Sequence, residues 1–238
     1  MTMISLPIRL KPDCGFEAFG SALRAFGKFL EVMSMVFVSC DLEGVFTPEI
    51  WIEVAKRLGI EKLKLTTREE KDYDKLMRMR ISTLRENHVS FSDISGIINS
   101  IDLLDGASDF MDSIRKLCPV AIVSDTFAEF FNSGFAQKLK WPLIFCHDLI
   151  VRDGYIDGYR IRIQGSKGKT VDALHGLNYK VFSFGDSYND IEMISKSESG
   201  CLFRSPERIK AEYPEIFATD SYDVLYSRIR DFVEIEGL

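Results

Sequence analysis

Four short apolar runs, each followed by polar residues, divide the chain. They cover residues 36–40, 120–123, 179–184 and 201–203 and are rich in β-branched and aliphatic side chains. Runs of this length are typical of strands that are buried on both faces. Helical spacings lie between them, as at Phe110, Ile114 and Leu117. The pattern predicts an α/β, Rossmann-like fold in which helices cover both faces of a parallel sheet.

Ligands of such sheets bind beyond the carboxyl ends of the strands. The residues that directly follow three of the predicted strands are Asp41, residues 124–126 and residues 185–190. We therefore expect the functional site to be formed by these three segments.

The interval between the first two strands is far longer than a usual connection. Thr47 is expected to cap a helix there, with Pro48 at its first position and Gly59 at its end. Further helical patterns cover residues 67–86 and 91–101.

These patterns predict a two-part organisation. Residues 47–104 would form a small helical cap domain, inserted into a core made of residues 35–46 and 105–238. Within the core, apolar and polar residues alternate over residues 149–163, where Asp153-Gly154 and Asp157-Gly158 supply turn residues. That segment predicts a β-hairpin.

The first 34 residues precede the first predicted strand. Phe16, Leu23 and Leu30 share one face of an amphipathic helical pattern. Three interpretations stay open: a docked helical extension, a weak targeting segment, or translated upstream sequence with Met35 as the true start.

Composition narrows the class of protein. A net charge of -6 provides no basic surface for nucleic acid or an anionic membrane. No apolar stretch approaches the length of a membrane span. The five cysteines are widely spaced, without a C-x-x-C pair, and are expected to be mostly buried thiols of a reducing compartment. We expect a cytoplasmic protein of unknown oligomeric state.

The first chemical signal is the pair Asp41 and Glu43, which precede Gly44 at a strand end. A carboxylate in the first position can attack phosphorus, and its neighbour can donate a proton to the leaving oxygen. A solvated strand-to-loop turn would use the same residue types.

The second signal is Ser124-Asp125-Thr126. The Ser124 hydroxyl and the free N–H groups of a following helix could hold phosphate oxygens, although simple helix capping has the same sequence signature. The third is Gly185-Asp186-Ser187-Tyr188-Asn189-Asp190, whose carboxylates suit Mg²⁺. The fourth signal is a lysine between these two motifs, Lys167 or Lys169, which could balance the charge of a phosphate.

In this order the four signals resemble the haloacid dehalogenase (HAD) superfamily, from about residue 35 to the C-terminus. Asp41-Leu42-Glu43-Gly44-Val45, Pro48-Glu49-Ile50-Trp51-Ile52, Ser124-Asp125-Thr126-Phe127 and the motif of residues 185–190 resemble the ThrH branch of the phosphoserine phosphatases. The resemblance implies a Rossmann-like HAD core with a C1-type helical cap. It also implies a Mg²⁺-dependent phosphatase that acts on phosphoserine and can pass the phosphoryl group to homoserine.

The resemblance also implies residue roles. Asp41 is the nucleophile, and Glu43 is the general acid and base, where most relatives have Asp. Mg²⁺ is held by Asp41, the carbonyl of Glu43 and Asp186, with Lys167, preferred over Lys169, opposite. Asp190 anchors metal-bound water or Lys167, and Asn189 braces the loop at the substrate.

For the amino acid part of the substrate, the resemblance implies that Glu49 meets the amino group and Arg80 the carboxylate. Arg80 could equally lie on a solvated helix face. His88, His147 and His175 are near no carboxylate motif in the sequence and are expected to be structural.

Three alternatives remain on the sequence alone: a pure phosphotransferase to homoserine, a phosphorylated signalling receiver, and a catalytically silent binding protein on the same fold. Other small phosphomonoesters are possible substrates as well.

Overall fold

The computed structural model describes residues 35–66, 69–70 and 72–237. The helix expected within residues 1–34 lies outside the described residues, as do residues 67 and 68 of the helical pattern predicted from residue 67. Among the described residues, no helix is long and apolar enough to cross a membrane.

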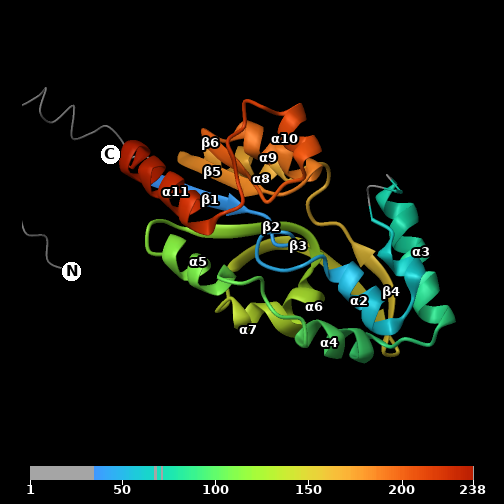
Figure 1. The fold of residues 1–238 in the computed structure, drawn as a ribbon. Helices are drawn as coiled ribbons and strands as arrows, with labels where there is room; N and C mark the ends of the chain where they lie inside the picture. The colour runs from blue at the N-terminus through green and yellow to red at the C-terminus, as the bar shows by residue number, and fades with distance from the viewer. Residues whose placement is uncertain (1–34, 67–68, 71, 238) are drawn as a thin grey trace, which may run out of the picture. The chain divides into compact units, whose positions relative to one another are not determined.

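A seven-stranded sheet in the order β4-β3-β2-β1-β5-β6-β7 organises these residues (Figure 1). The strands are β1 (Met35–Cys40), β2 (Val120–Phe127), β3 (Leu143–Arg152), β4 (Tyr155–Arg160), β5 (Tyr179–Gly185), β6 (Ser199–Phe203) and β7 (Ala218–Thr219). All neighbouring pairs are parallel except β3 and β4. The predicted α/β fold and the four predicted strands are confirmed.

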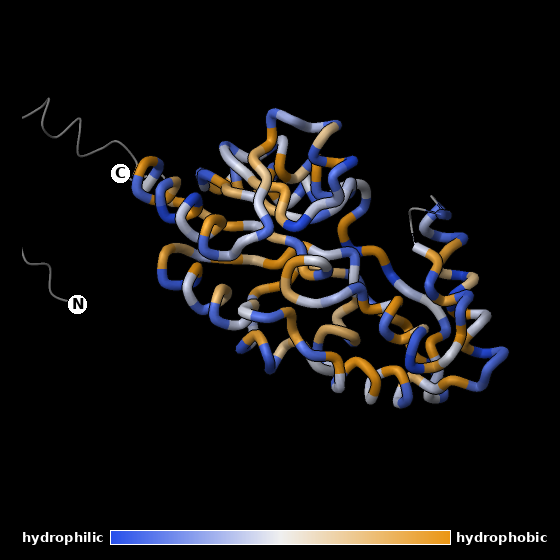
Figure 2. The backbone as a smooth tube through the Cα atoms, viewed as in Figure 1, coloured by the Kyte–Doolittle hydropathy of each residue, from blue (hydrophilic) through white to orange (hydrophobic). Residues whose placement is uncertain are grey.

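Alternating residues of the central strands point to opposite faces of the sheet, as the period of a strand requires. On β1, Val36 and Val38 pack on the side of α5 (Ala107–Ile114) and α11 (Tyr222–Glu236). Phe37 packs on the side of α8 (Gly168–Gly176) and α9 (Ile191–Lys196). In Figure 2, hydrophobic and hydrophilic positions alternate along the helices that cover the sheet. Cys40, Cys146 and Cys201 are buried thiols, and Cys118 is partly buried.

The helical insert, which joins β1 to β2, contains α2 (Ile50–Leu58), η1 (Glu61–Lys64), α3 (Tyr73–Glu86) and α4 (Phe91–Asn99). Asp72 caps α3 by accepting the N–H of Lys75, and Ser90 and Asp93 form a capping box on α4.

The prediction for the start of α2 was wrong. The helix begins at Ile50, and the Thr47 hydroxyl donates to Leu42 O at 3.5 Å. The N–H of Ile50 is instead accepted by Glu43 Oε2 at 2.8 Å. A side chain from the end of β1 therefore satisfies the free N–H group that Thr47 was expected to satisfy.

The predicted hairpin is present as β3 and β4, which turn at Asp153-Gly154. Asp157-Gly158 lies inside β4 and is not a second turn. The hairpin supports the insert: Arg85 of α3 pairs with Asp157 at 2.5 Å, and Phe91 N–H donates to Gly154 O at 2.8 Å.

Three further short helical segments, α6 (Ala128–Phe130), η2 (Phe131–Phe135) and α7 (Ala136–Lys138), connect β2 to β3. Beyond β5 lie η3 (Tyr188–Asp190) and, after β6, α10 (Glu207–Glu212).

Candidate active site

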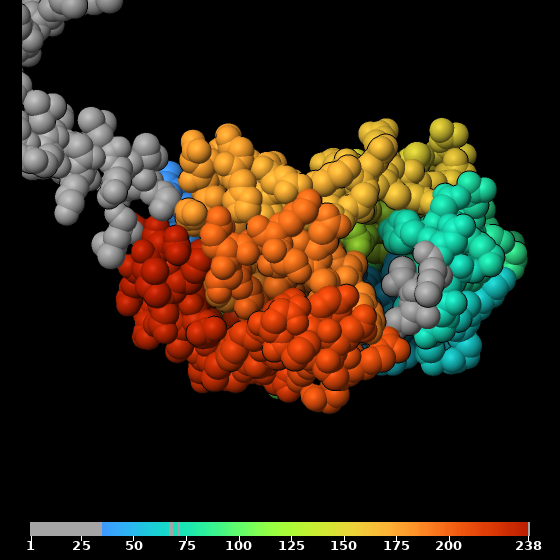
Figure 3. Space-filling model, turned by 90° about the horizontal axis from the view of Figure 1, so that it is seen from above, coloured from blue at the N-terminus to red at the C-terminus, as the bar shows by residue number. Residues whose placement is uncertain are grey.

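A cavity of about 580 Å³ lies beyond the carboxyl ends of β1, β2 and β5. In Figure 3 the surface is hollowed between the orange region around α10 and the teal surface of α3. The cavity is lined by Asp41, Glu43, Glu49, Trp51, Ile52, Thr66, Tyr73, Arg80, Ser124, Asp125, Thr126, Lys167, Asp186, Ser187, Tyr188, Asn189, Arg208 and Ile209. All three segments expected from the strand ends are among these residues.

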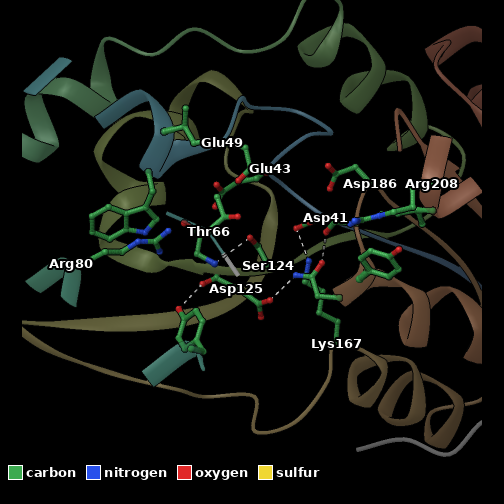
Figure 4. A pocket seen from close by; sticks show the side chains of 18 residues that line it. Asp41, Glu43, Glu49, Thr66, Arg80, Ser124, Asp125, Lys167, Asp186 and Arg208 are labelled. Atoms are coloured by element: carbon green, nitrogen blue, oxygen red, sulfur yellow. Dashed lines mark hydrogen bonds and ion pairs between the residues drawn. The ribbon is translucent and has the colours of Figure 1, made fainter. Parts of the chain in front are cut away.

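Lys167 lies at the centre of the buried charges (Figure 4). Its Nζ is 2.8 Å from Asp41 Oδ1 and 2.8 Å from Asp190 Oδ1, and all three side chains are almost fully buried. Burial alone would lower the pKa of Lys167, but the charges of Asp190 and Asp41 outweigh burial and raise the pKa well above its usual value, so the ammonium stays charged. Lys169, the alternative in the sequence, is exposed.

Asp41, Asp186 and Asp190 form an acidic cluster in which one carboxylate oxygen from each residue lies within 4.8 Å of the others. Burial raises the pKa of Asp41, and the charge of Asp190 raises it further. A cluster of hard oxygen donors with excess negative charge suits a divalent cation.

Two glycines allow this close approach. Gly44 has a φ of +72°, and a Cβ there would lie 2.5 Å from Asp186 Cγ. A Cβ on Gly185 would lie 2.2 Å from Asp190 Cγ. Any larger residue at either position would push a carboxylate out of the cluster.

Glu43 points from the end of β1 toward the helical insert, where it accepts the N–H of Ile50. Burial raises the pKa of its carboxyl to about 8, and the nearby charge of Glu49 acts in the same direction. A carboxyl with such a pKa can carry a proton at neutral pH, as a general acid must.

The pairing of β2 is irregular at residues 124–126. The register between β2 and β3 shifts between Val123 and Phe127, and the N–H of Thr126 donates to Ser124 Oγ at 3.2 Å. No helix begins at Ser124, because β2 continues to Phe127 and α6 starts at Ala128. The helix start that was expected to supply free N–H groups is therefore absent at this position, where β2 is an irregular strand.

The Asp125 side chain turns toward neighbouring segments. Its Oδ2 accepts the Asn189 Nδ2–H at 2.7 Å, and its carbonyl accepts the Tyr73 hydroxyl at 3.3 Å. His147 Nε2 lies 3.6 Å from Asp125 Oδ1. Burial would raise the pKa of Asp125, but the His147 contact, Lys167 and Asn189 together lower it.

The histidine prediction needs correction on this point. His147 and His175 both lie beside a carboxylate, His147 at Asp125 and His175 at 3.2 Å from Glu198 Oε2. His147 is brought to Asp125 by strand pairing, since His147 of β3 is the partner of Phe127 of β2.

Arg80 lines the wall that the helical insert provides. It is 5% exposed, so the solvated-face interpretation was wrong. Its guanidinium stacks on Trp51 at 4.6 Å and donates to Leu65 O at 2.8 Å. The buried Nε of Arg80 has no hydrogen-bond partner among the described residues. Burial lowers the pKa of Arg80 to about 10, which leaves it charged at neutral pH.

Sequence reasoning missed several lining residues. Tyr73 comes from α3, and Arg208 comes from α10 on the side of the cavity opposite Arg80 (Figure 4). Arg208 follows the strand predicted at residues 201–203, so the strand-end rule, extended by a few residues, would have included it.

Comparison with known proteins shows which sequences the chain is similar to. No sequence-family profile matches it. It is 40% identical to phosphoserine phosphatase ThrH of Pseudomonas aeruginosa over 190 residues, which cover 79% of this chain and 92% of the relative. It is 38% identical to a phosphoserine phosphatase of Pseudomonas syringae pv. tomato over 192 residues, which cover 80% of this chain and 81% of the relative.

Among solved structures, a phospho-aspartyl intermediate analogue of a phosphoserine phosphatase aligns with a TM-score of 0.66. The alignment covers 79% of this chain and 94% of that one at 20% identity, a level that supports the fold alone. The same family is indicated by the identities to the two Pseudomonas proteins, by the shared HAD fold and by the carboxylates at the strand ends. The chain therefore belongs to the phosphoserine phosphatase family of the HAD superfamily, in the branch that contains ThrH.

Proposed function

We propose that this phosphatase hydrolyses phosphoserine through an aspartyl-phosphate on Asp41. The observation that carries the proposal is the position of Asp41. Its carboxylate belongs to the acidic cluster and is in contact with Lys167. The same cavity is lined by Arg80 and Glu49. Phosphoryl chemistry and amino acid recognition can therefore take place on one small molecule.

In the first step, a carboxylate oxygen of Asp41 attacks phosphorus and the bond to the seryl oxygen breaks. Glu43 supplies the proton that the seryl oxygen takes up. In the second step, Glu43 takes a proton from water, whose oxygen attacks the same phosphorus. The acyl phosphate bond breaks, free phosphate leaves, and Asp41 regains its carboxylate.

An anionic nucleophile that approaches a phosphate dianion needs positive charge nearby. Lys167 provides one such charge. Mg²⁺ is the metal we propose for Asp41, Asp186, Asp190 and the carbonyl of Glu43, since a small hard cation prefers oxygen ligands. When bound, it supplies further compensation for the charge of the transferring phosphoryl group.

The phosphate would lie against the irregular part of β2 at residues 124–126. The Ser124 hydroxyl, the backbone N–H of Asp125 and the Lys167 ammonium would be its donors, and the N–H of Thr126 would first have to leave Ser124 Oγ. Because the Asp125 carboxylate is engaged with Asn189, this residue would contribute its backbone rather than its side chain to phosphate binding.

The amino acid part of the substrate would contact the insert. Arg80 offers an N–H group that lacks a partner among the described residues, and Glu49 lies on the same wall. Carboxylate binding by an arginine gives charge-assisted hydrogen bonds, and Glu49 would pair with the amino group. On this basis residues 47–104 act as the cap domain, closing the substrate over the core.

The proposal is tested by phosphate release from phosphoserine with and without Mg²⁺, comparing the wild type with Asp41→Asn. We expect metal-dependent release by the wild type and none by Asp41→Asn. Asp172→Asn is the matched control, because Asp172 pairs with Lys196 on the surface and does not line the cavity. Absence of release from phosphoserine, with release from another phosphomonoester, would contradict the substrate.

Addition of homoserine distinguishes hydrolysis from phosphoryl transfer. If homoserine is the physiological acceptor, phosphohomoserine forms at the expense of free phosphate. If water is the acceptor, homoserine leaves the rate of phosphate release unchanged.

A further inference from the structure

His147 has both ring nitrogens directed at polar groups although it is 4% exposed. Its Nδ1 accepts the backbone N–H of Arg162 at 3.4 Å, and its Nε2 lies 3.6 Å from Asp125 Oδ1. A buried histidine that only filled space would have no reason to bridge two chain segments in this way.

The contact with Arg162 selects the tautomer. Because Nδ1 acts as an acceptor, the hydrogen of the neutral ring is on Nε2, the nitrogen that faces Asp125. The backbone of Arg162 thus orients the imidazole so that an N–H group points at the carboxylate. This is the arrangement by which one side chain fixes the direction of another.

Asp125 also forms hydrogen bonds with two further segments. Its Oδ2 accepts from Asn189, in the loop that also carries Asp186 and Asp190, and its carbonyl accepts from Tyr73 of α3. Asp125 therefore connects the irregular end of β2, the loop after β5 and the helical insert.

A carboxylate in a phosphate-binding turn would repel a bound phosphate unless it is held away from it. We propose that His147 is a positioning residue for the phosphatase reaction. It holds the Asp125 carboxylate in its contact with Asn189, so that this negative charge does not turn toward the phosphate. This inference rests on the proposed phosphate site but not on the identity of the substrate.

The test uses two replacements of His147. Glutamine can place an amide N–H close to the position of Nε2, whereas phenylalanine keeps the ring shape without a donor. His175→Phe is the matched control, because His175 also contacts a carboxylate, Glu198, but lies outside the cavity. Each variant is examined in the wild-type and Asp125→Asn backgrounds, with Mg²⁺ present.

The readouts are kcat and KM for phosphoserine, the dissociation constant of inorganic phosphate by calorimetry, and the midpoint of urea unfolding. We expect His147→Phe to weaken inorganic phosphate and to lower kcat/KM by about tenfold to a hundredfold, the usual range for residues that orient others. His147→Gln should recover most of this loss. In the Asp125→Asn background the effect of His147→Phe should largely disappear, since the two residues act through one contact.

Equal losses for His147→Phe in both backgrounds, or losses that follow the urea midpoint alone, would show that His147 is only a packing residue. Retention of wild-type phosphate affinity in His147→Phe would overturn the proposal directly. If phosphoserine is not a substrate, the inorganic phosphate measurement still decides the question, so the two proposals fail separately.

Discussion

Lys167 Nζ lies 2.8 Å from Asp41 Oδ1, and both side chains are almost completely buried. A buried ion pair of this kind contributes little to stability by itself, because both groups lose their hydration. The position of this ion pair in the cavity suits phosphoryl transfer, in which a carboxylate must remain anionic next to a phosphate.

Lys167→Met should lower kcat by about a hundredfold to a thousandfold, the range for the loss of one charge-stabilising donor. It should also destabilise the metal-free protein by about 3–5 kcal/mol, because Asp41 and Asp190 are left buried without their partner. Steady-state kinetics and urea unfolding measure the two effects. Lys169→Met is the control, since Lys169 is exposed; equal losses in both variants would contradict the assignment of Lys167.

Arg80→Lys should raise the KM for phosphoserine with little change in kcat. Loss of a charge-assisted hydrogen bond costs about 1.5–3 kcal/mol, which corresponds to roughly a tenfold to hundredfold weaker interaction. Phosphoethanolamine, which lacks the carboxylate, should be hydrolysed equally by the variant and the wild type. Arg78→Lys on the same helix is the control, because the Arg78 side chain is 76% exposed. If kcat/KM falls equally for both substrates, Arg80 does not bind the carboxylate.

Arg208 is exposed, whereas Arg80 and Lys167, which line the same cavity, are buried. Arg208→Gln should therefore slow the capture of an anionic substrate and reduce kcat/KM several-fold at low salt. The difference should shrink as salt rises, because the Debye length falls to about 8 Å at 0.15 M ionic strength. Arg228→Gln removes the same charge from a guanidinium that stacks on Phe217 outside the cavity. A salt-independent defect in Arg208→Gln would argue against electrostatic capture.

Glu198 gives a pH-dependent contribution to stability at a distance from the active site. Burial alone would raise its pKa, but the Val181 N–H, donated at 2.8 Å, and His175 lower it. A folded-state pKa below the unfolded value of about 4.3 means that the stabilisation is fully present above that value. It is lost as the pH falls through the folded-state pKa.

Glu198→Gln should therefore reduce the free energy of unfolding at pH 7, and the difference from the wild type should narrow below about pH 4. Urea denaturation at pH 7 and at pH 3.5 measures it. Glu234→Gln, at a side chain 70% exposed, should behave like the wild type at both values. A difference for Glu198→Gln that stays constant with pH would refute this account.

The sequence was informative where chemistry follows strand ends. Asp41, Ser124 and Asp186 meet because β1 lies between β2 and β5 in a parallel sheet, an arrangement that places consecutive carboxyl ends at one edge. Lys167 could be chosen over Lys169 only through the resemblance, since in the sequence both precede the apolar stripe of Val171 and Leu174. Its burial between two carboxylates is a tertiary fact that local sequence does not contain.

The errors have separate physical causes. The residues at the start of α2 suggested Thr47 as its cap, but Glu43, which follows β1, satisfies the helix start instead. The first half of β3 was not predicted because Leu143 and Phe145 are 52% and 37% exposed, so this strand lacks the two-sided burial of the predicted strands. His147 reaches Asp125 only through the register of β2 and β3, a contact between segments distant in sequence.

Between Val123 and Phe127, β2 loses its register with β3, so the sheet is incomplete along the edge where the phosphate is proposed to bind. The N–H of Thr126 is accordingly accepted by the Ser124 hydroxyl instead of a neighbouring strand. Fewer hydrogen bonds of the sheet hold this edge, so we expect the ligand-free protein to be most mobile there. A phosphate bound as proposed would restrain the same edge for the length of one turnover.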